Sequence, residues 1–316
     1  MIKYVLKRIG AMLLTLFLIM VLSFIIIRLM PMNIFENPEV PPEVQYQLEE
    51  EMHLHDPIPV QLFYYLRNII VDFNFGTSVK LKPGAEVFSI IVDAIPPTVG
   101  LNILSLLISI PLGLIAGFTA ALKRNTWVDT VISFLIVLCI SIPSFVFASL
   151  MQYFLTFVFP IFPTLYDATG SLSVQLHSMV LPIIALALSP IATIGRYLRG
   201  ELIENISSEY ILLARTKGLS RAQATMRHAF RNSMMPITST LVSLITGVMG
   251  GSLVIEKMFS VPGMGGKLID SVMAGDHFLT VAVLIFYSII SLVTILIVDL
   301  AYGIIDPRVR IGGGNK

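Results

Sequence analysis

Three small groups of residues have types and spacings that could do chemistry. His53 and His55 flank Leu54 and offer two ligands for a metal, but no further His or Cys stands at ligand spacing beside them. The glycine-rich run 263–266 lacks the Lys-Ser/Thr pair that follows in a phosphate-binding loop. Cys139 is the single cysteine and lies in an apolar run. We therefore expect solvated loop histidines, a small buried thiol, and no metal, phosphate or disulfide site.

Catalytic motifs are missing from the sequence. It contains no Gly-x-Ser-x-Gly nucleophile elbow, no His-Glu-x-x-His zinc helix and no Gly-x4-Gly-Lys-Ser/Thr phosphate loop. Ionisable side chains are nearly absent from the long apolar runs, which disfavours a proton-coupled mechanism based on buried acids. We expect a chain that is not an enzyme, binds no cofactor and has no nucleic-acid partner.

The stretch 210–236 has residue types suited to recognition. Gly218 can end one helix, because glycine adopts the left-handed C-terminal conformation without penalty. Ser220 and Gln223 have capping-box spacing and can begin another. We expect that second helix to carry apolar side chains on one side and basic ones on the other: Ala222, Met226, Ala229 and Phe230 against Arg221, Arg227, His228 and Arg231. Such a helix suits docking into a groove on a soluble partner. The alternative is the ordinary excess of Lys and Arg in cytoplasmic loops.

The elements that position these residues are predicted to be membrane helices. The chain is 55% hydrophobic and 13% charged, against roughly 25% charged in average soluble domains, and its mean hydropathy is +0.85. Six apolar segments reach the length of about 20 residues that a bilayer crossing needs. They are Ile9–Leu29, Thr98–Leu122, Val128–Phe159, Ser178–Leu198, Ile237–Ile255 and Phe278–Ile304. We therefore expect an all-α integral membrane protein with six transmembrane helices.

Prolines and small residues single out two of these segments. Val128–Phe159 is too long for one straight crossing, and we expect Pro143 to kink it; Pro182 and Pro190 are expected to act similarly in the fourth segment. Small residues at the kink and in the fifth segment are plausible lining for a path through the membrane, and close helix packing is the alternative. These residues are Ser141, Pro143, Ser144, Gly247, Gly250, Gly251 and Ser252.

The distribution of basic residues predicts the orientation. Lys and Arg favour one side by roughly three to one, so this side is assigned to the cytoplasm and both termini with it. The first apolar run lacks a small-residue cleavage site and is expected to stay as a helix. Segment 31–97 is too long for a simple connector and is expected to form a small helical cap on the outer face.

Seven regions of the sequence, with the basic loop counted as one, together resemble the permeases of binding-protein-dependent ABC importers, along nearly the whole chain. Runs 214–220 (Ala-Arg-Thr-Lys-Gly-Leu-Ser) and 227–232 (Arg-His-Ala-Phe-Arg-Asn) in the basic loop are similar to the oligopeptide/dipeptide/nickel branch. The others are 4–8, Asp56-Pro57 with Val60-Gln61, 75–78, 141–145, Glu256 with Phe259 and 262–265, and 306–308. The long insertion after the first span makes the chain most like the first of the two oligopeptide permeases.

The resemblance implies a permease fold with four parts. These are an N-terminal transmembrane helix (1–30), an extracytoplasmic insertion (31–97), a core permease domain (98–306) with a cytoplasmic coupling loop (199–236), and a cytoplasmic tail (307–316). The location implied is a bacterial or archaeal plasma membrane.

The resemblance also implies partners. They are a homologous second permease, two ABC ATPases that bind ATP and Mg, an extracytoplasmic substrate-binding protein, a peptide substrate and membrane lipid. A helix from about 219 to 232 would couple the ATPases to the membrane bundle. The coupling residues implied are Ala214, Lys217, Gly218, Leu219, Met226, Arg227, Phe230 and Arg231.

The cargo is predicted from the low charge of the apolar segments. A path poor in fixed charge suits oligopeptides of varied sequence, whereas nickel would call for His or carboxylate ligands. The same type of importer for dipeptides, nickel chelates or glutathione-like ligands is the nearest alternative. A stand-alone secondary transporter and a membrane scaffold are alternatives from other classes. The block 52–56 departs from the family pattern, because it has histidines where a glycine is usual.

Overall fold

The structure is a computed structural model that describes residues 2–29, 42–51, 53–250 and 252–305. Throughout these ranges the chain is helical, apart from turns and an isolated antiparallel bridge between Thr77 and Glu86. It divides into two compact units: Met1–Thr98 with Pro262–Val293, and Val99–Val261 with Thr294–Lys316. Two long helices, α4 (Val87–Leu122) and α13 (His277–Ile305), run from one unit into the other.

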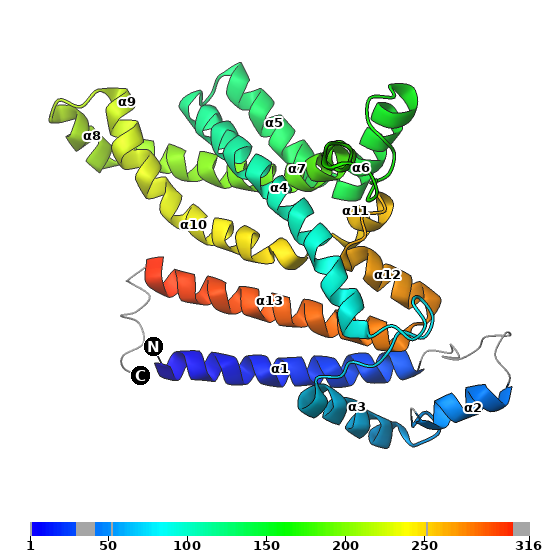
Figure 1. The fold of residues 1–316 in the computed structure, drawn as a ribbon. Helices are drawn as coiled ribbons and strands as arrows, with labels where there is room; N and C mark the ends of the chain where they lie inside the picture. The colour runs from blue at the N-terminus through cyan, green and yellow to red at the C-terminus, as the bar shows by residue number, and fades with distance from the viewer. Residues whose placement is uncertain (1, 30–41, 52, 251, 306–316) are drawn as a thin grey trace. The chain divides into compact units, whose positions relative to one another are not determined.

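The first unit contains the described helices of the predicted insertion 31–97 and the helices that pack with them. Its elements are α1 (Ile2–Leu29), α2 (Pro42–Glu51), α3 (Ile58–Asp72), the start of α4, α12 (Met264–Ala274) and most of α13 (Figure 1). Phe24 of α1, Tyr65 of α3 and Val281 of α13 belong to one buried cluster. Segment 31–97 thus contains the helices α2 and α3 among its described residues, as predicted; its role as a cap on the outer face stays a prediction.

A buried carboxylate fixes the loop between α3 and α4 in this unit. Asp276 is fully buried. Its Oδ2 accepts hydrogen bonds from Ser78 Oγ at 2.5 Å and from the backbone N–H groups of Lys80 and Leu81 at 3.1 and 3.2 Å. Because a buried carboxylate needs such donors, this contact holds the loop at the start of α13.

The second unit contains the remaining helices. They are the end of α4, α5 (Trp127–Ser141), α6 (Ser144–Gln152), the π-helix η1 (Tyr153–Val158), α7 (Leu172–Ile206), α8 (Glu209–Thr216), α9 (Arg221–Ala224), the π-helix η2 (Thr225–Phe230), α10 (Arg231–Thr246), the 3-10 helix η3 (Gly247–Gly250) and α11 (Leu253–Met258). One cluster around Leu181, Ile255 and Phe259 joins α7 to α11, and a second around Leu198 and Leu202 supports the basic loop.

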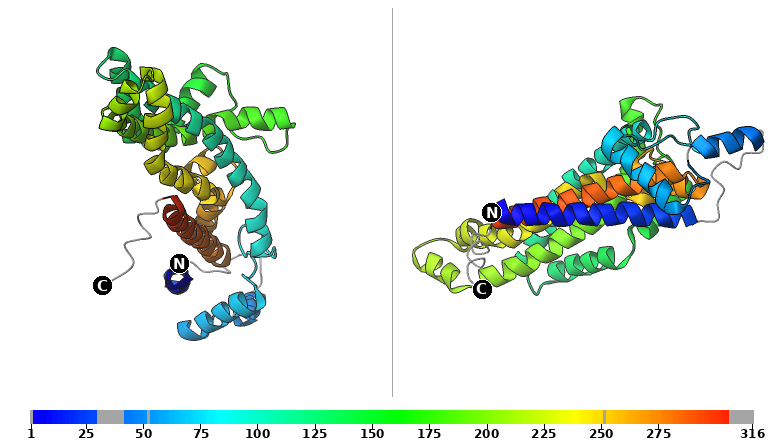
Figure 2. Two further views of the ribbon diagram at one scale, coloured as in Figure 1. Left: turned by 90° about the vertical axis from the view of Figure 1, so that its left-hand side faces the viewer. Right: turned by 90° about the horizontal axis from the view of Figure 1, so that it is seen from below.

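Five of the six predicted spans have counterparts among these helices. Four helices are long and apolar enough to cross a membrane: Leu6–Leu29, Val87–Leu122, Leu172–Ile206 and His277–Ala301. The fifth counterpart is a pair, Trp127–Ser141 and Ser144–Val158, bent by 100° (Figure 2). The kink expected at Pro143 is confirmed, since Ile142 and Pro143 leave the helical conformation at that step. In α7 the helix continues through Pro182 and Pro190; the kink expected at these prolines stays a prediction.

The remaining predicted span, Ile237–Ile255, is wrong as one continuous helix. The helix α10 begins earlier, at Arg231, and ends at Thr246; the chain then forms η3 before α11 begins at Leu253. Glycine is a poor helix former because it loses the most backbone entropy on ordering, and Gly247 and Gly250 lie at this interruption. Gly251 lies outside the described residues.

Candidate functional site

The basic loop has the local structure that its sequence predicts. Gly218 follows α8 with a φ of 95°, and the N–H of Leu219 donates to the carbonyl of Ala214 at 3.3 Å, which closes the helix end. Ser220 then begins α9: its Oγ accepts from Gln223 N at 3.3 Å, while Gln223 Oε1 accepts from Ser220 N at 3.0 Å. The capping box and the glycine stop are both confirmed.

The second helix of the loop differs from the prediction in its periodicity and its end. The helices α9, η2 and α10 follow one another without a break from Arg221 to Thr246, so no separate helix ends near 232. The π-helical turn of η2 takes more residues than an α-turn and rotates the later side chains. Ala222 and Met226 are exposed while Ala229 is fully buried. The predicted apolar face, which placed all of these on one side, is wrong.

The inner side of the loop packs on α4 and α7. Ile211, Ala214 and Ala229 are buried in one cluster with Leu198 and Leu202 of α7. Phe230 belongs to the same packing and meets Phe118 of α4 edge to face, with ring centroids 5.6 Å apart. Two predicted coupling residues, Ala214 and Phe230, therefore hold the loop on its own unit rather than face outward.

A polar side chain that the sequence did not single out joins three helices of the loop. Asn205, near the end of α7, donates through Nδ2 to Ser233 Oγ of α10 at 3.1 Å. Its Oδ1 accepts from the hydroxyl of Tyr210 in α8. Ser233 is fully buried and donates in turn to the carbonyl of Ala229 at 2.8 Å. An amide with donors and an acceptor can serve both neighbours at once, so this network fixes α8 and α10 relative to α7.

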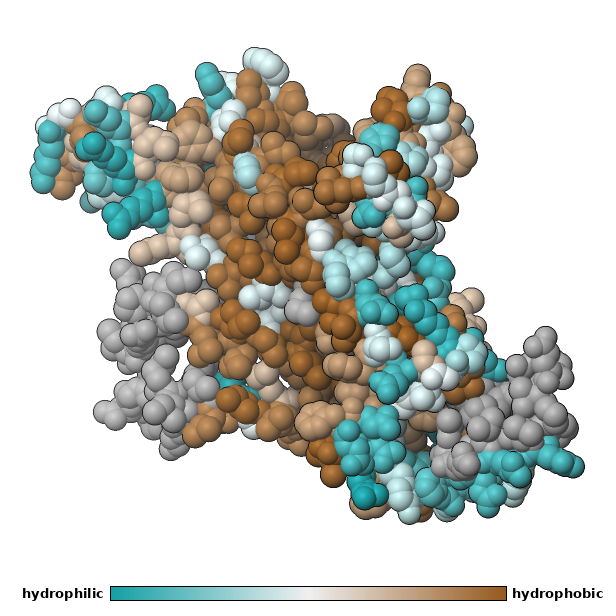
Figure 3. All heavy atoms as spheres, in the orientation of Figure 1, coloured by the Kyte–Doolittle hydropathy of each residue, from teal (hydrophilic) through white to brown (hydrophobic). Residues whose placement is uncertain are grey.

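The outer side of the loop combines apolar and basic side chains. Leu212, Leu213 and Met226 are exposed by 62%, 56% and 52%. Basic side chains are exposed on the same segments: Arg215, Lys217, Arg221, Arg227 and Arg231. Hydrophilic residues gather over α8 and α9 in the space-filling view (Figure 3). We call the set Leu212, Leu213, Met226 and these five cations the loop surface.

The predicted coupling residues divide between the two sides. Lys217, Gly218, Met226, Arg227 and Arg231 are exposed. Leu219 is half-buried. Leu212 and Leu213 were not among the predicted coupling residues. Their neighbours Ile211 and Ala214 at helical spacing were a usable signal, because in a short helix the residues between two buried positions face outward.

A second polar contact that the sequence did not reveal links α5 to α7. Arg199 donates through Nε and Nη2 to the two carboxylate oxygens of Asp129 at 2.6 and 2.8 Å. The Asp129 side chain is 7% exposed and that of Arg199 is 31% exposed. Asn125 N and Ser133 Oγ also donate to the Asp129 carboxylate, at 3.1 and 3.3 Å. A two-point guanidinium–carboxylate pair of this kind sets orientation as well as distance.

The residues predicted to line a path lie in the second unit. Ser141 and Pro143 are exposed at the bend between α5 and α6, and Ser144 is half-buried. Gly250 and Ser252 are half-buried, and Ser252 Oγ accepts from Ile255 N at the start of α11. Ala148 of α6 and Ile255 of α11 belong to one buried cluster, so the helices next to these two groups pack together. Whether they line a path stays a prediction.

The two loop histidines each face a carboxylate. His53 Nδ1 lies 2.9 Å from Asp56 Oδ2, and His55 Nε2 lies 3.1 Å from Glu49 Oε2. Both side chains are more than two-fifths exposed, at 43% and 46%. His53 has a φ of 57°, a left-handed conformation that favours glycine. No group of three His, Cys, Asp or Glu that could hold a metal occurs in the part of the chain that the structure describes.

Comparison with known proteins shows which family the chain matches and which proteins are similar to it. The model for the inner membrane component of binding-protein-dependent transport systems matches residues 109–311, and a model for the N-terminal part of such membrane components matches 1–102. The dipeptide transport system permease protein DppB of Lactococcus lactis is 38% identical over 98% of this chain and 100% of its own length. The Bacillus subtilis protein of the same name is 36% identical over 98% and 99%. The oligopeptide transport system permease protein OppB of Escherichia coli K12 is 34% identical over 98% and 100%.

Proposed function

Because the chain belongs to the inner membrane component family of binding-protein-dependent transport systems, we propose that it forms part of an importer's path for oligopeptides. Two observations support peptides as cargo. Relatives that match nearly the whole chain have names that specify oligopeptide or dipeptide transport. The predicted spans also carry little fixed charge, which suits a cargo of varied side chains. Dipeptides are the second candidate, favoured by the 38% identity to a dipeptide permease.

The proposed assembly follows the family's dependence on a binding protein. A homologous second permease completes the path, two ABC ATPases bind ATP and Mg on the cytoplasmic side, and a binding protein delivers the peptide from outside. The chain crosses the plasma membrane six times in this proposal, with α10 to α11 as the fifth crossing and both termini in the cytoplasm. Segment 31–97 then lies outside the membrane, and Ser141, Pro143, Ser144, Gly247, Gly250, Gly251 and Ser252 are the proposed path residues.

The loop surface is the proposed contact with an ATPase. Its exposed apolar and basic side chains are the observation that supports the coupling mechanism. Each exposed apolar side chain buried on docking would contribute up to roughly 1.5–3 kcal/mol. The surrounding cations would add pairing with acidic groups that weakens as salt rises. Leu212, Leu213 and Met226 replace Phe230 as the proposed apolar anchors, because Phe230 packs on Phe118.

Transmission of movement is proposed to run through the inner side of the loop. The Asn205 network and the cluster around Leu202 connect α8 and α10 to α7. A displacement of the loop surface is therefore passed to two long helices instead of being absorbed in the loop. To shift the permease between inward-open and outward-open states, each nucleotide state of the ATPases must bind one permease state more tightly.

Substitutions at Met226 test the proposed contact. We expect Met226→Asp to abolish ATP-driven uptake of a reconstituted peptide transporter and to reduce co-purification of the ATPase, since a charge replaces an exposed apolar group that docking would bury. Met226→Leu is the matched control. It should keep uptake and ATPase co-purification within about twofold of the wild type, because apolar swaps of similar volume cost little. Membrane insertion should be unchanged in both. Normal uptake by a Met226→Asp transporter that still assembles would contradict the assignment.

A further inference from the structure

The bent helix pair of the second unit gives α6 and η1 a course of their own. The helix Ser144–Val158 is bent by 100° from α5, and in the left view of Figure 2 it projects sideways from the second unit. Membrane helices tilt by about 20° on average from the bilayer normal. With α5 at that tilt, a helix bent by 100° from it runs within about 30° of the membrane plane. The two halves therefore do not form one straight crossing.

The half that crosses the membrane is α5. It begins on the side of the basic loop, because α4 ends there, with Phe118 against Phe230. Its 15 residues are roughly 22 Å long at 1.5 Å per residue. Ile142 and Pro143 follow in extended conformations, with ψ of 124° and 139°, and add roughly 7 Å. Together they match the hydrocarbon thickness of about 30 Å, so the chain has reached the far side of the membrane where α6 begins at Ser144.

One side of α6 and η1 packs on the second unit. Ala148 is fully buried, and Met151 and Leu155 pack against the same cluster. That cluster includes Leu181 of α7 and Ile255 of α11. Because these contacts are apolar and lie on one side of the segment, α6 and η1 are fixed to the unit and their opposite side is free for another contact.

The opposite side is exposed and has no charge. Its apolar and aromatic side chains are between 45% and 68% exposed. From Thr130 to Tyr166 the sequence contains no Asp, Glu, Lys, Arg or His. Large exposed apolar patches mark contacts with a protein or a membrane. We call the following set the α6–η1 face: Phe145, Leu150, Tyr153, Phe154, Phe157 and Val158.

The polar side chains of the segment bond within the protein, as hydrocarbon requires. Ser149 Oγ donates to the carbonyl of Phe145 at 2.9 Å, and Thr156 Oγ1 donates to the carbonyl of Gln152 at 2.5 Å. Gln152 Nε2 donates to the carbonyl of Thr164 at 2.8 Å. Polar groups in the bilayer core need such internal partners because no water is present there.

The size of the exposed side chains favours lipid over another helix as the neighbour. Interfaces between membrane helices are enriched in small residues, which let the backbones approach each other. The α6–η1 face consists instead of large side chains, four of them aromatic. Among these, Tyr153 joins an apolar ring to a hydroxyl, and tyrosine is enriched where hydrocarbon meets the headgroups.

We infer that α6 and η1 lie along the membrane plane, at the hydrocarbon boundary opposite the basic loop, with the α6–η1 face against phospholipid acyl chains. The third crossing is then α5 with Ile142 and Pro143, and α6 and η1 anchor its outer end in one leaflet. The inference rests on the proposed membrane topology and not on the cargo. Peptide uptake can fail while the lipid contact is present, and the lipid contact can be absent from a transporter that takes up peptides normally.

Fluorescence quenching by lipid measures the depth of this segment. The chain has a single tryptophan, Trp127, so a Trp127→Phe background can carry Phe157→Trp or the matched control Phe134→Trp as its one reporter. The two phenylalanines are similarly exposed, at 68% and 63%, and Phe134 lies in the middle of α5. The full-length variants are reconstituted in phosphatidylcholine brominated either near the headgroup or near the acyl-chain ends. The shallow bromine should quench the Phe157→Trp reporter about twofold more than the deep one, and the order should reverse for Phe134→Trp.

Two quenching results would overturn the inference. Stronger quenching of Phe157→Trp by the deep bromine would show that the helix descends into the membrane. No quenching of Phe157→Trp by either lipid, with normal quenching of Phe134→Trp, would show that protein covers the α6–η1 face.

Lysine substitutions test the same depth through membrane insertion. A lysine at a boundary can extend its ammonium into the headgroup region, whereas one at the centre of a crossing cannot. We therefore expect Phe157→Lys to keep the yield of inserted full-length protein within about twofold of the wild type, and Phe134→Lys to lower it about tenfold. Equal losses in the two variants would contradict the inference.

Photo-cross-linking in the assembled transporter distinguishes lipid from a second permease as the neighbour. Cys139 is the single cysteine of the chain, so a Cys139→Ser background can carry Phe157→Cys labelled with a benzophenone maleimide. Irradiation should join this label to phospholipid and to no other subunit. A product that joins the two permeases through this position would overturn the inference.

Discussion

Asn205 and Asp129 show how single polar side chains set the geometry of the second unit. Asn205 contacts Tyr210 and Ser233, and Asp129 pairs with Arg199 through two hydrogen bonds. The Asn205–Ser233 and Asp129–Arg199 contacts join residues 28 and 70 positions apart in the sequence. Neither residue belongs to a recognisable motif, because the partner of a lone Asn or Asp depends on how helices pack.

Substituting Asp129 tests the value of the ion pair at the residue scale. We expect Asp129→Asn to lower the free energy of unfolding by roughly 1–3 kcal/mol, since the amide leaves Arg199 without a compensating charge. The lower part of that range applies if solvent reaches the partly exposed guanidinium. Thermal unfolding in detergent measures the change.

A double-mutant cycle with Arg199→Gln provides the control. The double variant should lose less stability than the two single variants summed, because the charge left unpaired in each single variant is absent from the double. Strictly additive losses would mean that the pair contributes no coupling. A Lys217→Gln change, on an exposed cation of the loop surface, should leave the unfolding temperature within about 1 °C.

The positions at which helices begin, end or bend are the features that the sequence predicts best. The stop at Gly218 and the start at Ser220 depend on contacts within a few residues, and the structure has both. The bend at Pro143 is also local, because proline removes a donor wherever it stands. Length and hydropathy alone place five of the six predicted spans.

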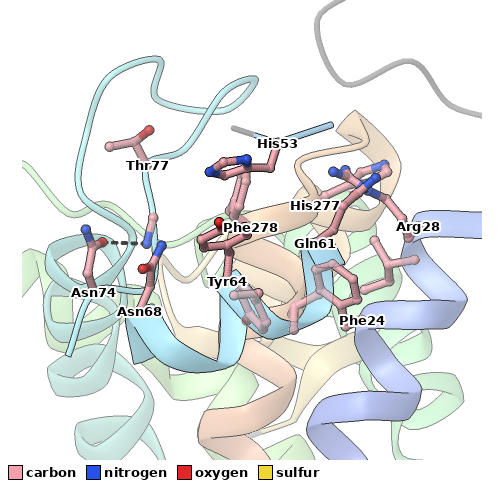
Figure 4. Close-up of a pocket in the computed structure, with 14 residues that line it drawn as sticks. Phe24, Arg28, His53, Gln61, Tyr64, Asn68, Asn74, Thr77, His277 and Phe278 are labelled. Atoms are coloured by element: carbon pink, nitrogen blue, oxygen red, sulfur yellow. Dashed lines mark hydrogen bonds between the residues drawn. The ribbon is translucent and has the colours of Figure 1, made fainter. Parts of the chain in front are cut away.

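The failures have a different origin. The π-helix η2 at Thr225–Phe230 was not predicted, because no local residue pattern specifies such a turn. Phe230 was predicted to face a partner, whereas it packs on Phe118 of α4. Arg28 of α1, Gln61 of α3 and His277 of α13 line one cavity of the first unit (Figure 4), and their approach depends on tertiary packing. The sequence offered only an arginine at the end of an apolar run.

The left-handed turn at Gly218 gives a prediction at the element scale. Nothing lies within 4 Å of a Cβ built at Gly218, so the cost of Gly218→Ala comes from its φ of 95° and not from a clash. We expect a loss of about 1–2 kcal/mol in stability. A thermal-unfolding series in detergent checks this value.

Gly200 provides the matched control within the same unit. It lies inside α7, and a Cβ built there also meets nothing within 4 Å. Gly200→Ala should be neutral or stabilising by up to about 1 kcal/mol, since alanine favours the helix. Equal effects of the two alanines would contradict the backbone explanation. Gly218→Asn should lose less than Gly218→Ala, because asparagine tolerates the left-handed region.

At the scale of the whole molecule, the two units carry different chemistry. The first contains the cavity with Arg28 and the loop fixed by Asp276. The second contains the loop surface and the bent helix pair. The family defines the chain as the membrane component of a transport system that depends on a binding protein. In the proposed importer, one polypeptide meets partners on both sides of the membrane.

Cysteine cross-linking from the loop surface tests the central claim most directly. In a Cys139→Ser background, Met226→Cys should cross-link to an ABC ATPase subunit in membranes containing the assembled transporter, with a yield that changes when ATP is added. Met273→Cys should give no cross-linked ATPase product. It is the matched control, because Met273 in α12 is also an exposed methionine, at 78%. An ATPase product from Met273→Cys with none from Met226→Cys would contradict the account, because the loop would then not be the surface on which the ATPase acts.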